Sequence, residues 1–131
     1  SSMTGPFPLI DTSSGTNFAY AWYGCSSMTG PFPLIDTSNG TNFAYAWYGC
    51  SSMTSFPAGM FDTCPATEFT DAFVDCALNQ TSIDNILVSI AAAGTSGGTL
   101  NMTGGTNATP SATGLAAKAT LVGRGWTVTH N

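Results

Sequence analysis

Charged side chains are scarce in this chain of 131 residues. They make up 7% of it, where roughly 25% is typical of soluble globular domains. Only Lys118 and Arg124 are basic, and the net charge is -5. Two cations cannot neutralise a row of phosphates or hold a helix on an anionic lipid surface, so binding to a nucleic-acid backbone or to a membrane surface is excluded.

Long hydrophobic runs are also missing. A bilayer-spanning helix needs about 18 or more apolar residues in a row, and the closest stretch, 83–93, is interrupted by Asp84, Asn85 and Ser89. Membrane insertion is therefore not expected. No secretion signal is visible, and the start at Ser1 without an initiator methionine suggests a processed chain or a piece of a longer one.

Residues that carry out catalysis are few. Histidine occurs once, as His130, and no nucleophile or carboxylate near it in sequence completes a triad or an acid pair. The glycine pairs 97–98 and 104–105 lack the lysine of a phosphate-binding loop, and no cysteine spacing is typical of a metal site. We expect a protein that is not an enzyme and that uses no cofactor and no metal.

Hydroxyl groups take the place of charge. The chain has 14 serines and 20 threonines, with 15 glycines and 7 prolines beside them. A hydroxyl-rich surface with little charge suits contacts with carbohydrate, which are made through hydrogen bonds and aromatic stacking. Such contacts depend little on ionic strength, because screening acts on charges.

The N-terminal half is a tandem repeat. Residues 1–25 and 26–50 match at 24 of 25 positions, and a degenerate third copy covers 51–76. The remaining segment, 77–131, does not repeat the unit. Such a pattern is typical of units that stack on one another, because one unit alone cannot bury its apolar side.

Each unit is expected to form a short strand, a turn and a short helix. In the second unit the apolar run 32–35 favours a brief strand, since it contains Pro33. Four apolar residues within 42–50 have the i, i+3, i+4, i+7 spacing of one helical face: Phe43, Ala46, Trp47 and Cys50. Thr41 or Asn42 is the candidate N-cap. Stacked units would give an α/β fold, a right-handed solenoid with a parallel sheet on one face and helices on the other.

The repeated pattern MTxxFPxIDTSxGTNFxxAWxGCSS resembles the BspA-like class of bacterial surface leucine-rich repeats. Met3, Met28 and Met53 stand where that family usually has leucine, and an inserted Gly-Pro pair lengthens the first two units. The resemblance covers 1–76. It implies a leucine-rich-repeat-like solenoid of three units.

The segment 77–131 resembles the C-terminal part of many phage and prophage structural proteins, tail-fibre-like chains in particular. Its residues predict helix, strand, helix and strand at 82–93, 98–102, 111–122 and 126–129. Thr81 is the expected N-cap of the first helix, and Gly94 and Gly123 are the expected stops. We expect this strand-helix-strand (βαβ) unit to cap the same solenoid and to hide its open strand edge.

Two sets of polar residues recur at fixed positions in the repeats. Cys25, Cys50 and Cys76 are expected to form an inward ladder of small buried side chains, whereas Cys64 lies in a turn and forms a disulfide only if a second cysteine Cα lies within about 7 Å. A second ladder consists of Asp11, Asp36 and Asp62. Each aspartate is expected to accept hydrogen bonds from its own turn. Calcium binding is the alternative, although no single unit offers enough oxygen ligands.

The aromatic residues divide into two groups by the expected helical phase. Trp22, Trp47 and Phe73 fall on the inward side and are predicted to lie in the core. Four tyrosines fall on the outward side: Tyr20, Tyr23, Tyr45 and Tyr48. Repeated exposed tyrosines favour a platform for sugar rings or for another protomer. The alternative is that they only pack against one another.

The sequence thus predicts a non-enzymatic structural and adhesive element. We expect it to be extracellular, on a virion appendage such as a phage tail fibre or on a cell surface, where the four tyrosines contact a glycan or protein receptor. Weak contacts repeated along the array would add through effective concentration. The alternatives are a bacterial surface leucine-rich-repeat adhesin and a subunit of an extracellular filament, associating with itself or with other appendage proteins.

Overall fold

The protein is a small α/β fold with two parallel three-stranded sheets, of strand order β1-β2-β3 and β4-β5-β6. The computed structural model describes residues 5–6 and 11–131, so Met3 and the first-unit apolar run 7–10 lie outside the described residues. The elements are β1 (Gly5–Pro6), β2 (Met28–Pro31), β3 (Met53–Ser55), β4 (Glu68–Phe69), α1 (Gln80–Ala92), β5 (Thr99–Met102), α2 (Ala112–Gly123) and β6 (Thr127–His130).

The expected leucine-rich-repeat-like solenoid of strand-turn-helix units is wrong. Within the described part of the three repeats there is no α-helix, since both helices of the described chain lie after residue 76. The strand of the second unit is β2, which ends just before the expected run 32–35. In that run Phe32 and Ile35 are buried, whereas Leu34 is exposed.

The segment 42–50 shows why no helix forms. The backbone N–H group of every second residue donates to a carbonyl of the third unit. The donors are Phe43, Tyr45, Trp47 and Gly49. Between these donors, the N–H groups of Ala46, Tyr48 and Cys50 each donate to the carbonyl three residues earlier in the same unit. Tyr45 and Gly49 have φ values of 58° and 76°, in the left-handed region that an α-helix does not contain. The four residues of the expected helical face are nonetheless completely buried.

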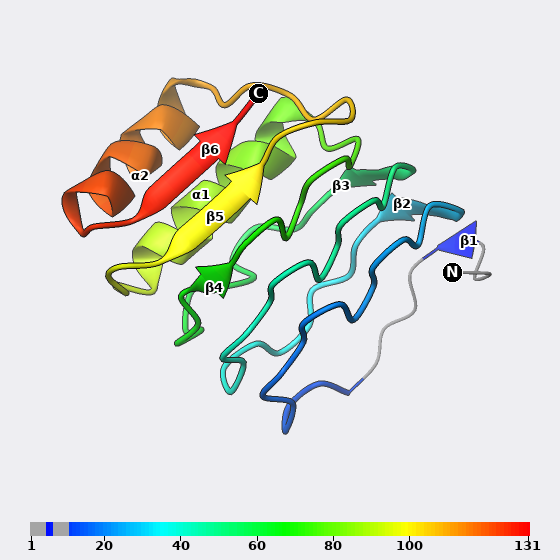
Figure 1. Cartoon of the computed structure of the whole chain (residues 1–131), viewed down its shortest axis with the longest axis horizontal. Coiled ribbons are helices and arrows are strands. Elements are labelled where there is room, and N and C mark those ends of the chain that lie inside the picture. Colours follow the sequence, from blue (N-terminus) through cyan, green and yellow to red (C-terminus); the bar gives the residue numbers. More distant parts are fainter. Residues whose placement is uncertain (1–4, 7–10) are drawn as a thin grey trace.

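The three units lie side by side and run in the same direction (Figure 1). Parallel bridges join Asn17 to Asn42 and Asn42 to Glu68, so the units stay in register away from the strands as well. β5 and β6 continue this row of parallel segments beyond β4. The helices α1 and α2 lie together on one face of these two strands (Figure 1).

The helices and strands expected in 77–131 are confirmed to within two residues at each end. Asn79, rather than Thr81, is the N-cap of α1, because its Oδ1 accepts a hydrogen bond of 2.9 Å from the Ser82 N–H. Ser111 caps α2. β5, α2 and β6 form a parallel strand-helix-strand unit. Because the fold is not the expected solenoid, the prediction that this unit caps a solenoid is also wrong.

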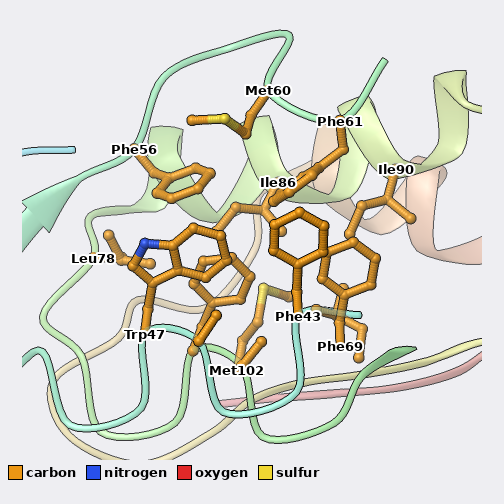
Figure 2. Close-up of a cluster of buried hydrophobic side chains, with 14 of the residues drawn as sticks. Phe43, Trp47, Phe56, Met60, Phe61, Phe69, Leu78, Ile86, Ile90 and Met102 are labelled. Atoms are coloured by element: carbon orange, nitrogen blue, oxygen red, sulfur yellow. The ribbon is translucent and has the colours of Figure 1, made fainter. Parts of the chain in front are cut away.

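One hydrophobic core runs through both parts of the chain (Figure 2). In the repeats it is a stack of rings: Trp47 lies between Trp22, with 5.2 Å between ring centroids, and Phe73, at 4.8 Å. Beyond the repeats the core is mainly aliphatic and includes Ile86 and Ile90 of α1. The core therefore changes from aromatic to aliphatic along the row of units.

Candidate functional site

The four outward tyrosines of the sequence analysis lie together in the structure. Tyr20 of the first unit stacks on Tyr45 of the second, with 4.9 Å between ring centroids and 6° between ring planes. Tyr23 stacks on Tyr48 in the same way, at 5.2 Å and 11°. Within each unit the two rings are tilted, with centroids 5.5 Å apart in the first and 5.8 Å in the second. We call these four residues the tyrosine cluster.

An unusual backbone conformation positions two of these rings. Tyr20 and Tyr45 have φ values of 61° and 58°, which cost a bulky residue about 1–2 kcal/mol. Backbone hydrogen bonds to the next unit hold this conformation, from the Tyr20 N–H to the Ala44 carbonyl at 3.0 Å and from the Tyr45 N–H to the Thr70 carbonyl at 2.9 Å. The stacked geometry is therefore built by the repeat and not by the tyrosines alone.

The tyrosine cluster is open to solvent, mostly at its first unit. Tyr20 and Tyr23 are 57% and 48% exposed, and their partners Tyr45 and Tyr48 are half-buried. Stacking covers the facing sides of the paired rings. The surface that remains for a ligand consists of ring edges, phenol hydroxyls and the uncovered faces of the two first-unit rings.

The two rows of the tyrosine cluster end differently in the third unit. Asp71 takes the place equivalent to Tyr20 and Tyr45, and Val74 the place equivalent to Tyr23 and Tyr48. Asp71 has a φ of 51°, like the tyrosines before it, and its Oδ1 accepts a hydrogen bond of 2.8 Å from Asn101.

The Asp71 carboxylate acts on its neighbour in the row. Its negative charge is the largest cause that raises the pKa of Tyr45 above the usual value, and burial, the other tyrosines and a hydrogen bond to Asp71 add to the rise. One row therefore ends at a carboxylate beside a phenol, and the other at an apolar side chain.

The aspartate ladder uses its oxygens locally. Asp11 Oδ1 accepts hydrogen bonds from the Ser13 N–H at 3.0 Å and from the Ser13 hydroxyl at 2.7 Å. Asp36 accepts the same pair from Ser38 at 2.9 and 2.6 Å. The serine hydroxyl, followed by the backbone N–H, lowers the pKa of each carboxyl. In the third unit Cys64 stands two residues after Asp62, where the earlier units have a serine, and the Asp62 N–H donates to the Gly59 carbonyl.

The cysteine ladder lies inside the repeats. Cys25, Cys50 and Cys76 are buried, and the thiols of Cys50 and Cys76 donate to carbonyls one unit earlier, those of Trp22 and Trp47, at 3.2 and 3.1 Å. Burial raises the pKa of Cys50 to about 12. All four cysteines are free thiols, so Cys64 forms no disulfide here.

The roles of two residues near the third unit were not predicted from the sequence. Asp71 could have been found by alignment, because it replaces a tyrosine at an equivalent position. Asn107 is buried and binds the backbone of Phe73 and Met102 through its Nδ2 and of Leu78 through its Oδ1. No sequence signal marks it, since it lies outside the repeats.

The described residues form no pocket and no metal-ligand cluster. Over residues 5–6 and 11–131, no helix has the length and apolarity to cross a bilayer. Comparisons with protein-family models, curated proteins and solved structures find no match. The two resemblances seen in the sequence therefore stay predictions.

Proposed function

We propose that this protein is a non-enzymatic structural and adhesive element whose tyrosine cluster contacts carbohydrate on a cell surface. One observation carries the proposal. Two nearly identical units each bring two tyrosines to one exposed surface, and the pairs stack in register. The four rings lie outside the buried core, so their stacking in register is not needed to fill it.

The chemistry of the tyrosine cluster fits a sugar polymer. A phenol has an apolar ring and a polar tip, and a sugar ring has C–H faces and hydroxyl groups, so both kinds of surface find a partner. With few charges nearby, such binding changes little with ionic strength. Each additional unit of this kind adds a further weak contact, and linked weak contacts bind more strongly together than alone.

The proposed location is extracellular, on a virion appendage such as a tail fibre or on a cell surface. The resemblance of 77–131 to phage structural proteins supports it, as does the hydroxyl-rich composition of the chain. A row of stacked units gives reach, and the exposed tyrosines give contact. Both are properties that an appendage needs.

A binding assay on isolated polysaccharides tests the proposal. The probes are peptidoglycan sacculi and lipopolysaccharide, with the intact chain at low and at high salt. The double variant Tyr20→Ala, Tyr23→Ala removes the two most exposed rings, and the control Val122→Ala removes an exposed apolar side chain from α2. We expect the double variant to lose about tenfold in affinity, equivalent to about 1.4 kcal/mol, and the control to bind like the wild type. Binding of equal strength by all three proteins, or no binding to either probe, contradicts the proposal.

Self-association is a second candidate, favoured by the outer edge of the first unit. The carbonyls of Ala44 and Ala46 accept hydrogen bonds from the first unit, whereas the equivalent carbonyls of Ala19 and Ala21 accept none from the described residues. A second copy of this chain would supply donors to that edge and extend the row into a filament. Sedimentation over a range of concentrations tests this candidate, and a monomer at every concentration contradicts it.

A further inference from the structure

We propose that Tyr20 and Tyr45 form an oxidative cross-linking site, at which a peroxide and a haem peroxidase join the two rings through a carbon-carbon bond. The product is a dityrosine that ties the first unit to the second. This inference goes beyond carbohydrate contact and does not depend on it.

The geometry places the two phenols as reaction partners before any oxidant arrives. Their centroids are 4.9 Å apart, the shortest distance among the four ring pairs of the tyrosine cluster, and their planes are within 6° of parallel. Backbone hydrogen bonds to the following unit hold both residues in register. Tyr20 is 57% exposed, so an oxidant reaches it without unfolding the chain. Holding two reactants together in this way speeds a coupling step.

The chemistry balances with one peroxide. Each phenol loses one electron and its O–H proton and becomes a tyrosyl radical, whose unpaired electron is shared with the ring carbons next to the C–O bond. One such carbon of Tyr20 bonds to one of Tyr45, and the hydrogen on each of these carbons moves to the oxygen to restore the phenols. The two electrons and two protons removed reduce hydrogen peroxide to two molecules of water.

Asp71 selects this row over the other. It occupies the next position of this row on the same left-handed backbone, beside Tyr45, so its carboxylate is in place to accept the proton released on oxidation. The row of Tyr23 and Tyr48 has nearly the same stacking but ends at Val74, which accepts no proton. The two rows therefore differ mainly in proton acceptance, and the second row is an internal control for the first.

The test uses the full chain, diluted so that links within one molecule dominate. The chain is treated with hydrogen peroxide and a haem peroxidase, and the monomer is isolated, unfolded, reduced and alkylated so that no disulfide survives. Cleavage before aspartate separates the pairs, because Tyr20 and Tyr23 fall in peptide 11–35 and their partners in peptide 36–61. Mass spectrometry then looks for the two peptides joined, with the loss of two hydrogen atoms.

The expected product is a joined pair of peptides linked at Tyr20 and Tyr45. Tyr20→Phe should abolish this link, since phenylalanine keeps the ring but has no phenol, and Tyr23→Phe should leave it. Asp71→Asn should slow the linking several-fold at neutral pH. A link mainly between Tyr23 and Tyr48, a loss of two hydrogens within a single peptide, or cross-links found only between molecules would each overturn the proposal, as would an unchanged rate in the Asp71 variant.

Discussion

The repeats and the C-terminal segment extend the same parallel row by different means. In 11–76 the segments between strands are turns bonded to the neighbouring unit, whereas in 77–131 they are the helices α1 and α2. The core is aromatic in the first part and mainly aliphatic in the second. The difference teaches that an apolar pattern of helical spacing specifies which side chains are buried, but not where the backbone finds its hydrogen bonds.

The backbone partner decides between the two structures. In the repeats, a nearly identical unit lies in register alongside and accepts a hydrogen bond at every second residue, and left-handed residues such as Tyr45 and Gly49 turn the chain back each time. In the C-terminal segment Asn79 and Ser111 cap continuous helices, which satisfy their own backbone. Gly94, with a φ of 77°, follows α1 as its stop.

The largest loss of stability should come from removing the central ring of the aromatic core in the repeats. Trp47 is fully buried and stacks on Trp22 and Phe73. We expect Trp47→Ala to lower the free energy of unfolding by about 3–5 kcal/mol, measured by denaturant titration. Val122→Ala, at an exposed site on α2, should change it by less than about 0.5 kcal/mol. Equal effects of the two substitutions would contradict the ring stack as the centre of the repeats.

High pH should lower the stability of the repeats in particular, because all four cysteines lie there. The folded chain holds the Cys50 proton more tightly than the unfolded chain does, with a pKa of about 12 against 9.0. This contribution to stability is complete below pH 9 and is lost as the pH rises toward 12, at about 1.4 kcal/mol per pH unit. Unfolding measured over this window should show a smaller loss in Cys50→Ala. An identical pH profile of the two proteins would contradict the prediction.

Asn107 should test the joint between the two parts. Its buried amide binds the Phe73 carbonyl at 2.8 Å and accepts from the Leu78 N–H at 3.0 Å. Asn107→Ala leaves these backbone groups without partners, and we expect a loss of about 2 kcal/mol. The exposed Thr120→Ala on α2 serves as the control. Hydrogen exchange should show the loosening at the joint, and protection unchanged there would be evidence against it.

The smallest effect should come from the helix cap. Asn79→Ala removes the side-chain acceptor at the start of α1, at a cost of about 1 kcal/mol. Asn42 in the repeats accepts a similar bond, from the Ala44 N–H at 2.9 Å, but begins no helix. Circular dichroism should therefore show a loss of helical signal near the unfolding transition for the Asn79 variant only. The same loss in Asn42→Ala would mean that the repeats contain helix.

The two parts of the fold were predictable to different degrees. In 77–131, apolar spacing and turn residues act over a few residues, so the helices and strands were found to within two residues, although Asn79 and not Thr81 caps α1, and α2 includes Gly123. In the repeats, the burial of Phe43, Ala46 and Trp47 was predicted correctly, but the helix was not there. Long-range pairing between units overrides local periodicity, and nothing in one unit alone reveals it.

The tyrosine cluster was predicted as a set of outward residues, although for a helical reason that does not hold. The structure adds that the rings stack across units and that Asp71 ends one row. Both features depend on the left-handed backbone at Tyr20 and Tyr45. Bulky residues rarely adopt that conformation, so propensity alone argues against it.

The hydrogen bonds between units give the row a mechanical character. They point from one unit to the next, along the direction in which the units stack. We expect a pull in that direction to load the outermost unit first, because its bonds to the next unit lie along the pull. A fully extended unit of 25 residues is about 80 Å long. The expected response to tension is therefore a stepwise lengthening of the stacked units, one unit at a time.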